Sequence, residues 1–412
     1  MFKKRLSPFA CVIISLLCCI VTFVAVYSLA SVERDRAVNA AREKGAQTGS
    51  AAADASDAGD DAARYEKLKS IIDYTKAHFL WDIDENKMWD AVYSAALNSL
   101  GDRYTFYMTA DDYIANWTPS GGLVGIGVRY ADDYTDGVFI VEVMERGPAY
   151  AAGIRRCDVI TGVDSIESDG TNRDALVEAV RGEPGTEVKL TVLRDGKKLS
   201  FNVVREPLPG DSAYSIDLGN DTWLVCITTF SNDDSAKDII AEIEKVRSLG
   251  AEKLVFDLRG NPGGSLDQVV ETLDYLLPEG DIVSYNDLSG TKQTERSGAS
   301  FLDMPMAVVC DDSTVSAAEL FTAAMKDYKA AVVVGKTTFG KGIMQYIRTF
   351  KDGSAVSVTT SYYYPPSGVN YHEKGVEPDY TVEDDRPRGS AYFIDPLNND
   401  YQLKKAFELL NK

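Results

Sequence analysis

The chain has 412 residues, of which 43 are basic and 63 acidic, so its net charge is −20. This acidic balance argues against nucleic-acid binding, which requires a basic face. Hydrophobic residues make up 45% of the chain, which supports packed cores over about two or three domains rather than disorder.

The N-terminus predicts a membrane anchor. Lys3, Lys4 and Arg5 precede residues 9–30, a run without a charged side chain. An apolar run of about 20 residues can span a bilayer, and the basic stub should stay cytoplasmic. A cleaved signal peptide, ending at Ser28-Leu-Ala30, is the alternative, but its apolar core usually has about 7–15 residues. We therefore expect a single-pass cell-membrane protein with residues 1–30 as stub and anchor and an extracytoplasmic remainder.

The next segments predict a tether and helices. Residues 31–62 are rich in Ala, Asp, Gly and Ser, a composition typical of flexible linkers. Apolar residues then recur with helical spacing from Ala63 to about Met108, and Gly101 closes the second helix. We expect a helical region over residues 63–117.

Residues 118–205 have the pattern of short strands separated by glycine turns. Gly137–Val143 and Glu187–Leu193 alternate or run apolar, Asp195-Gly196 signals a hairpin, and Asp174–Val180 a short helix. This segment predicts a small β-rich module.

Strands and helices alternate from about residue 213, which indicates βαβ units and a largely parallel sheet. The fold class is therefore α+β multidomain, with an α/β core over residues 206–385, against which 64–117 should pack, and a helical extension over 386–412. The expected core strands are Trp223–Phe230, Lys253–Leu258, Met306–Cys310, Ala331–Gly335 and Ala355–Tyr364. Three helices are expected between them: one with Ser231 as its N-cap, one that carries Val269 to Leu276, and one from Ser316 to Asp327.

The cysteines give no disulfide framework and no metal site. Cys11, Cys18 and Cys19 lie in the expected anchor, whereas Cys226 and Cys310 lie in apolar strands and should be buried thiols. No Cys/His cluster has the spacing of metal ligands.

Ser316 has two interpretations. Ser316-Ala-Ala-Glu319 is a capping box, in which serine and glutamate satisfy the first amides of a helix. Alternatively, Ser316 is a nucleophile at a strand-to-helix turn, where the free amides can stabilise an oxyanion. Ser313 is a second hydroxyl that could fill either role. The four residues alone favour the cap.

A serine nucleophile needs a base, and the chain has only two histidines, His78 and His372. Both are more typical of packing or surface positions. A lysine can replace histidine where burial lowers its pKa. Lys341 lies between two glycines, and Gln345 follows in position to hydrogen-bond its amine. A solvated lysine in a plain turn is the alternative.

Two glycine-rich segments are candidates for binding a ligand. Gly335–Lys341 has the spacing of a phosphate-binding loop, but Gly342 occupies the place of the Ser or Thr that holds magnesium, so this match is weak. Asn261-Pro-Gly-Gly264 ends a buried strand, and its two glycines allow close backbone approach to a ligand. A plain βα turn explains the second segment equally well.

These segments together resemble the C-terminal processing peptidases, also called tail-specific proteases, over about residues 64–385. The motifs occur in the family's order: Leu100–Met108, Gly125–Val128, Gly147–Ile154, Asp257–Gly264, Asp312–Glu319, Phe339–Gln345, Tyr364–Gly368 and Lys374–Asp379. The resemblance implies that residues 118–205 are a PDZ domain and residues 206–385 a serine protease core without metal or organic cofactor.

The resemblance also implies roles for individual residues. Ser316 would be the nucleophile, Lys341 the general base and Gln345 the residue that orients the lysine. The oxyanion hole would use the amides of Gly263 or Gly264 together with that of Ala317. The amides of the PDZ loop would bind the free C-terminus of a substrate protein and gate the protease; these are Gly125, Ile126, Gly127 and Val128. By the same analogy the N-terminal helices could form a homodimer.

Cys157 and Ser165 depart from the family by replacing glycines of the PDZ turn, and Val315 replaces a smaller residue before the nucleophile. The intact dyad favours a protease over an inactive membrane-tethered PDZ scaffold. A Ser-His hydrolase that uses His372 is a third, less favoured reading.

Overall fold

The computed structural model describes residues 57–117, 124–131, 133–208, 212–383 and 390–412. The chain divides into two compact units, one formed by residues up to 109 with 349–357 and the other by 110–348 with 358–412. The anchor expected at residues 9–30 and most of the expected linker lie outside the described residues. No helix among the described residues combines the length and apolar character needed to cross a membrane.

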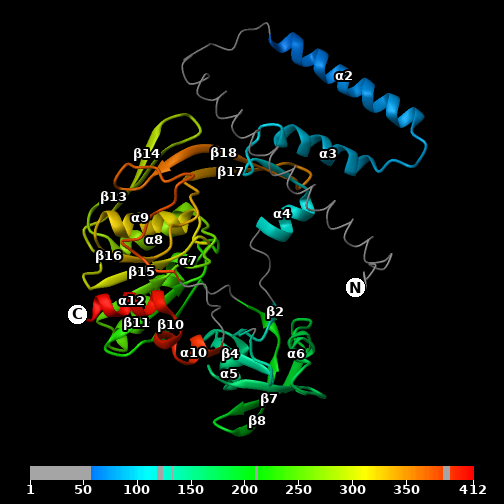
Figure 1. Ribbon diagram of the computed structural model, residues 1–412. Helices are drawn as coiled ribbons and strands as arrows, with labels where there is room; N and C mark the ends of the chain where they lie inside the picture. Colours follow the sequence, from blue (N-terminus) through cyan, green and yellow to red (C-terminus); the bar gives the residue numbers. More distant parts are fainter. Residues whose placement is uncertain (1–56, 118–123, 132, 209–211, 384–389) are drawn as a thin grey trace, which may run out of the picture. The chain divides into compact units, whose positions relative to one another are not determined.

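The first unit contains helices α2 (Asp57–His78) and α3 (Glu85–Asn98) and the strand β1 (Phe106–Met108) (Figure 1). Asp84 caps α3 by accepting the Lys87 N–H. The prediction of helix up to Met108 is wrong at its end, because β1 pairs antiparallel with Ala355–Ser357. Aromatic residues after a helix-ending glycine favour a strand once a partner is available.

The second unit opens with helix α4 (Ala110–Trp117), followed by a β module. One sheet of the module has the order β3-β4-β5-β7-β8, with β6 beside β5, and a separate pair joins β2 to β9. The predicted Asp195-Gly196 turn joins β7 to β8 and is confirmed. The bounds are β2 Val124–Gly125, β3 Val128–Tyr130, β4 Val138–Val143, α5 Pro148–Ala152, β5 Val159–Val163, β6 Ile166–Glu167, α6 Arg173–Val180, β7 Glu187–Arg194, β8 Lys197–Val204 and β9 Glu206–Pro207.

The rest of the second unit is an α/β core whose sheet has the order β10-β11-β12-β15-β16-β19. All neighbours from β11 to β19 are parallel and β10 is antiparallel, so the predicted parallel sheet is confirmed. The bounds are β10 Ala213–Asp217, β11 Thr222–Ile227, α7 Ser235–Ser248, β12 Lys253–Asp257, α8 Leu266–Leu276, β13 Gly280–Asn286, β14 Lys292–Ser297, β15 Met306–Cys310, α9 Ala317–Asp327, β16 Ala331–Gly335, β17 Ile343–Thr349, β18 Ala355–Tyr364, β19 Tyr380–Thr381, α10 Ser390–Ile394, α11 Pro396–Asn399 and α12 Tyr401–Leu410.

Helices cover both faces of the parallel sheet (Figure 1). Alternating side chains of the parallel strands enter two cores, one on each face. Phe256 and Val308 pack with α7, α8 and α9 on one face. Val255 and Val309 pack with α10 and α12 on the other. Cys226 and Cys310 are buried as predicted. Ser231 is not the cap of α7, since the helix begins after Asp234.

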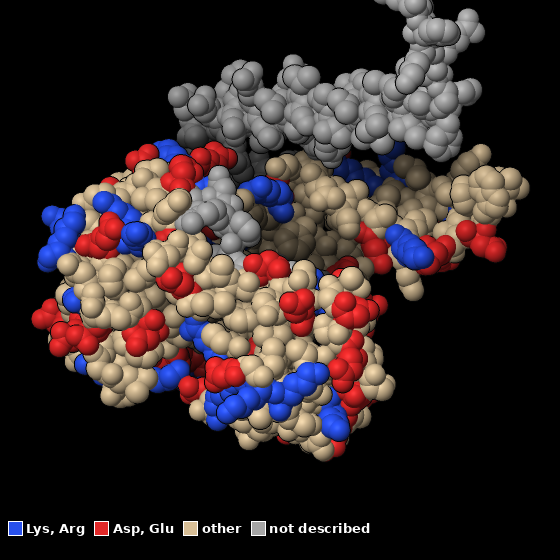
Figure 2. Space-filling view, turned by 60° about the horizontal axis from the view of Figure 1, so that its bottom comes forward, with Lys and Arg blue, Asp and Glu red and all other residues tan. Residues whose placement is uncertain are grey.

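The described surface carries charges of both signs. On the face shown in Figure 2, acidic and basic side chains lie side by side, without a broad basic field among the described residues.

Candidate active site

Ser316 lies at the turn between β15 and α9, in a strained backbone conformation with φ 59° and ψ −117°. A non-glycine residue is rarely held at positive φ unless its surroundings fix it, and such strain clusters at functional sites. Here the turn is fixed by Thr314, whose hydroxyl donates to Leu258 O at 2.9 Å, and by Val315, whose N–H donates to Asn261 O at 2.9 Å. The side chain of Ser316 is therefore presented at the helix N-terminus.

Glu319 connects this turn to the loop that carries Lys341. Its carboxylate is fully buried and accepts four hydrogen bonds. Oε2 accepts the backbone N–H groups of Ser316 at 2.8 Å and Lys341 at 2.7 Å, so those two nitrogens lie at most 5.5 Å apart. Oε1 accepts the Thr338 hydroxyl and the Gly340 N–H, both at 2.6 Å.

Burial raises the pKa of the Glu319 carboxyl, and its four donors oppose that shift by stabilising the ionised form. The sequence interpretation recognised Glu319 only as half of a capping box, and that half exists, since it accepts the Ser316 N–H. It missed the bonds to the lysine loop. The signal that could have revealed these bonds is the presence of an acidic residue inside an otherwise apolar helical run.

A second set of hydrogen bonds also holds the Lys341 loop. Asn370 donates to Gly342 O at 2.7 Å and Tyr363 O at 2.6 Å, and the Tyr363 hydroxyl donates to Lys341 O at 2.7 Å. Tyr371 donates to the Tyr363 hydroxyl at 2.9 Å, and its own hydroxyl oxygen lies 3.5 Å from Ser316 O. Burial raises the pKa of Tyr371 well above its usual value, so it remains a neutral donor.

Two apolar residues close to Lys341 in the sequence differ in burial: Ile343 is 5% exposed and Phe339 is 42% exposed. Of these two, Ile343 is the one that could help to desolvate the lysine. Gln345 lies on β17 and donates from Nε2 to the Thr359 hydroxyl at 3.2 Å. This bond uses the donor end of the amide, whereas a lysine ammonium would need its carbonyl oxygen. The role of Gln345 towards Lys341 stays a prediction.

The glycine loop after β12 lies against the Ser316 turn. A Cβ on Gly263 would come within 2.6 Å of Val315 O and 2.9 Å of both Ala317 N and Ser316 Cβ. A Cβ on Gly264 would come within 2.1 Å of the Phe230 carbonyl carbon. Both positions therefore require glycine.

The amides of this loop are not equivalent. The Gly263 N–H donates to Asn261 Oδ1 at 2.8 Å, while Asn261 Nδ2 donates to Ile227 O at 2.8 Å. The N–H groups of Gly264 and Ala317 have no acceptor among the residues that the structure describes. An oxyanion hole built from Gly264 and Ala317 is thus better supported than one that uses Gly263. The sequence interpretation gave Asn261 no role, although it is the buried brace of the loop.

The two histidines have different surroundings. His78 is exposed and stacks on Tyr74 at a ring distance of 4.3 Å. His372 packs edge-on against Tyr362, and its Nδ1 is buried without a hydrogen-bond partner among the described residues. Its backbone N–H would lie 2.9 Å from a Cβ on Gly342, so the His372 segment flanks the lysine loop.

The glycine segment Gly125–Val128 of the β module is held mainly through its carbonyl groups. Met144 N–H donates to Gly127 O at 2.9 Å, and Ala149 N–H donates to Ile126 O at 2.8 Å. The Leu208 side chain lies against the loop, 3.3 Å from the Cβ positions of both glycines. Cys157 has φ 66°, a left-handed conformation that favours the glycine it replaces.

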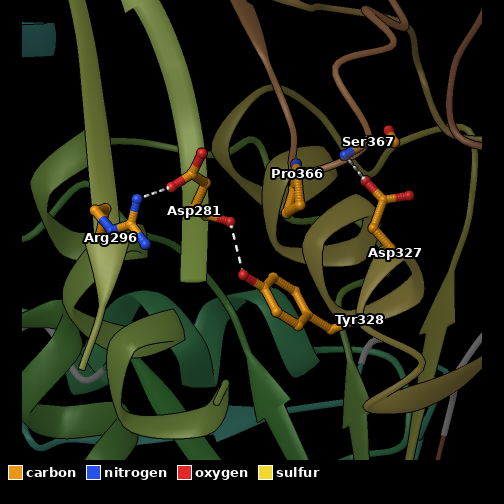
Figure 3. A pocket seen from close by; sticks show the side chains of 6 residues that line it. All are labelled: Asp281, Arg296, Asp327, Tyr328, Pro366 and Ser367. Carbon is orange, nitrogen blue, oxygen red and sulfur yellow. Dashed lines mark hydrogen bonds and ion pairs between the residues drawn. The ribbon is translucent and has the colours of Figure 1, made fainter. Parts of the chain in front are cut away.

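A separate cavity of about 540 Å³ lies at the other end of α9 (Figure 3). α9 has 11 residues, which at about 1.5 Å per residue places this cavity roughly 16 Å along the helix from Ser316. Its polar groups pair with one another: Arg296 with Asp281, and Asp327 with the Ser367 N–H. It is distinct from the candidate active site. No group of potential metal ligands is found among the described residues.

Comparisons with known proteins agree with this arrangement. The sequence pattern of peptidase family S41 matches residues 221–382, and that of the PDZ domain matches residues 122–204. A protein of Staphylococcus aureus strain N315 described as "Probable CtpA-like serine protease" is 32% identical over 350 residues, covering 83% of this chain and 69% of the relative. A protein of the same description from Staphylococcus saprophyticus is 31% identical over 353 residues, 84% of this chain and 70% of the relative.

A crystal structure assigned to the S41 proteases, from Bacteroides fragilis NCTC 9343, has a similar fold, with a TM-score of 0.53 at 16% identity over 77% of this chain and 90% of the other. The resemblance drawn from the motifs is therefore confirmed. The chain belongs to peptidase family S41, as a CtpA-like serine protease that carries a PDZ domain.

Proposed function

We propose that this protease cleaves protein substrates near their C-termini with Ser316 as nucleophile and Lys341 as general base. The observation that carries the proposal is the shared carboxylate oxygen of Glu319, which accepts the backbone N–H of both residues. One buried group thereby fixes the serine turn and the lysine loop together, as a two-residue catalytic unit requires.

In the proposed reaction the neutral Lys341 amine removes the proton of Ser316 Oγ as that oxygen attacks the scissile carbonyl carbon. The negative charge that develops on the carbonyl oxygen is stabilised by the N–H groups of Ala317 and Gly264. The Lys341 ammonium then gives its proton to the leaving amine. Water repeats the sequence on the acyl-enzyme, with Lys341 again acting as base.

The PDZ domain is proposed to bind the free C-terminus of the substrate and to gate the protease. The N–H groups of Gly125–Val128 supply charge-compatible donors for a carboxylate, and a peptide can add as a strand to the edge of such a module. Peptides ending in a carboxylate should bind more tightly than the same peptides ending in an amide, and equal affinities would contradict this role.

The remaining part of the proposal concerns location. An uncleaved anchor over residues 9–30 would hold the protease and PDZ domain outside the cytoplasm, which the basic stub before it supports. N-terminal sequencing of the mature membrane protein tests this directly. A chain that begins at Ser31 would show a cleaved signal peptide instead.

Substitution of Ser316 by alanine tests the nucleophile. Ser316→Ala should abolish cleavage while retaining the fold, whereas Ser313→Ala, which changes the exposed hydroxyl of the same turn, should cleave as the wild type does. The readout is mass spectrometry of C-terminal fragments from a substrate protein. Cleavage by Ser316→Ala at a rate near wild type would reduce Ser316 to a helix cap.

Lys341→Arg separates a base from a positive charge. Guanidinium stays protonated and cannot accept the serine proton, so this variant should lose about 10²–10⁴ in rate, as Lys341→Ala should. Substantial activity of the arginine variant would mean that the position needs only a cation. His372, whose segment flanks the loop, would then be the next candidate base.

A further inference from the structure

The glycine loop after β12, residues 259–264, is called the oxyanion loop below. A buried ion cluster lies at its start. Arg259 is 6% exposed, Asp257 1% and Asp400 3%. Arg259 donates from Nε and Nη2 to the two carboxylate oxygens of Asp257, at 2.9 and 2.7 Å. Its Nη1 donates to Gln402 Oε1 at 2.9 Å and lies 2.6 Å from Asp400 Oδ2.

The members of this cluster come from distant parts of the chain. Asp257 ends β12 and Arg259 opens the loop to Gly264, whereas Asp400 and Gln402 lie at the start of α12. These last two residues fall beyond residues 221–382, the segment that matches the family pattern. Asp400 also caps α12 by accepting the Leu403 N–H at 2.8 Å.

From Arg259 the loop connects directly to the serine turn. The Gly260 N–H donates to Asp311 Oδ1 at 3.1 Å, and the adjoining residues Leu258 and Asn261 accept from Thr314 and Val315. A displacement of Arg259 would therefore reach both the oxyanion loop and the turn that presents Ser316.

We propose that Asp400 is a positioning residue for catalysis: α12 holds Arg259 through Asp400 and thereby sets the position of the oxyanion loop. This inference rests on the proposed roles of Ser316, Gly264 and Ala317. It makes the C-terminal helices part of the catalytic machinery, although they contribute no group that touches the substrate.

The physical reason is that a buried guanidinium is held by its partners. Burial disfavours the charge on Arg259, but the carboxylates of Asp257 and Asp400 outweigh it and raise its pKa well above the usual value. Asp257 ends β12 and holds Arg259 from the sheet, whereas Asp400 holds it from a separate helix. Asp400 is therefore the ion partner through which α12 acts on the loop.

Asp400→Asn is a selective test. Asparagine is as good an N-cap as aspartate, so α12 keeps its cap, while Nη1 loses its charged partner. The control is Asp395→Asn, an exposed aspartate of the same segment that accepts from Asn398 rather than from Arg259. Four quantities are measured on the full chain: kcat and KM for a peptide substrate, affinity for a peptide boronic acid, and the melting temperature.

A boronic acid forms a tetrahedral adduct with a serine, so its affinity reports the oxyanion hole rather than ground-state binding. We expect kcat and boronic-acid affinity of Asp400→Asn to fall together by about 10- to 100-fold, with KM within about twofold of wild type. Loss of an entire oxyanion donor usually costs more, about 10²–10³. Asp395→Asn should match wild type in all measurements.

Wild-type kcat and boronic-acid affinity in Asp400→Asn would overturn the inference, as would an activity loss that only follows the fraction of unfolded protein. If this variant does not fold, Gln402→Met removes the other partner of Nη1 and must show the same paired loss. The two proposals fail separately: activity of Ser316→Ala overturns the nucleophile, whereas an unaffected Asp400→Asn overturns only the positioning role.

Discussion

Two glycine loops of this protein are expected to bind negatively charged oxygens, and they are held in different ways. The oxyanion loop at Gly263–Gly264 is braced by buried side chains, with Asn261 bonded to its amide and Arg259 fixed at its base. The PDZ loop at Gly125–Gly127 is held by backbone hydrogen bonds, among them those of the Gly125–Glu206 strand pair, and by contact with Leu208.

The difference matches the tasks proposed for the loops. A transition state gains most from donors that are already in place, because reorganisation during the reaction raises the barrier. A peptide-binding loop can adjust to different C-termini without such a penalty. Buried side chains therefore hold the oxyanion loop, whose geometry should limit the reaction rate. Backbone hydrogen bonds are enough for the PDZ loop, which only has to bind a ligand.

The largest effect is expected from Gly264→Ala. The new Cβ would collide with the Phe230 backbone, and φ of 148° is unfavourable for alanine. We expect no measurable activity and a loss of about 2–4 kcal/mol in the free energy of unfolding. Gly290→Ala, at φ 80° with nothing nearby, is the control and should stay active. An active Gly264→Ala enzyme would show that the loop is less rigidly packed than described.

Glu319→Gln should follow in size. Either orientation of the amide places an NH₂ group against two donors, because both carboxylate oxygens accept two hydrogen bonds. Each unsatisfied buried donor costs about 1–3 kcal/mol. Denaturant unfolding should show this loss, and kcat should fall at least about tenfold. The exposed Glu252→Gln serves as control. Unchanged stability and kcat would show that Glu319 does not hold the Ser316 turn and the Lys341 loop together.

Gly127→Ala should act mainly on the PDZ domain. Its φ of 76° disfavours alanine by about 1–2 kcal/mol, and the Cβ would lie 3.1 Å from Gly147 Cα. Fluorescence anisotropy should show weaker binding of a free C-terminal peptide, by about tenfold. Gly185→Ala has similar backbone strain without neighbours and should bind normally. Equal affinities of the two variants would place the carboxylate elsewhere.

The smallest effect is expected from Cys157→Gly. Glycine relieves the left-handed conformation at φ 66° but adds freedom to the unfolded chain, so the net gain should be under about 1 kcal/mol. Thermal unfolding beside Cys157→Ala, which keeps the strain, measures it. A glycine variant no more stable than the alanine variant would mean that the turn is not strained.

Much of the core could be predicted from the sequence because its elements are strongly patterned. The apolar runs of β15 and β16 have the expected bounds, since burial on both faces of a parallel sheet leaves little ambiguity. β1 could not be predicted, because a three-residue strand exists only through its partner at Ala355–Ser357. The cap of α7 was misplaced because Ser231, Asn232, Asp233 and Asp234 are all capping residues.

The candidate site shows the same division. Motifs placed Ser316, Lys341 and the glycine loop in the right family order, and the backbone strain at Ser316 agrees with a special role. Pattern alone could not show that the Gly263 amide is already bonded to Asn261, since this depends on the conformation of a buried turn. It also could not show that Phe339 is half exposed.

The sequence by itself determined the βαβ core and the β module, because these follow from local periodicity, and its short motifs supplied the proposed reactive side chains. Only the tertiary structure decided what holds them. Glu319 meets Lys341, and Arg259 meets Asp400, across separations of 22 and 141 residues in the chain. Such contacts arise from the packing of helices on a sheet. A buried charged side chain pairs with the polar or oppositely charged group that this packing places next to it.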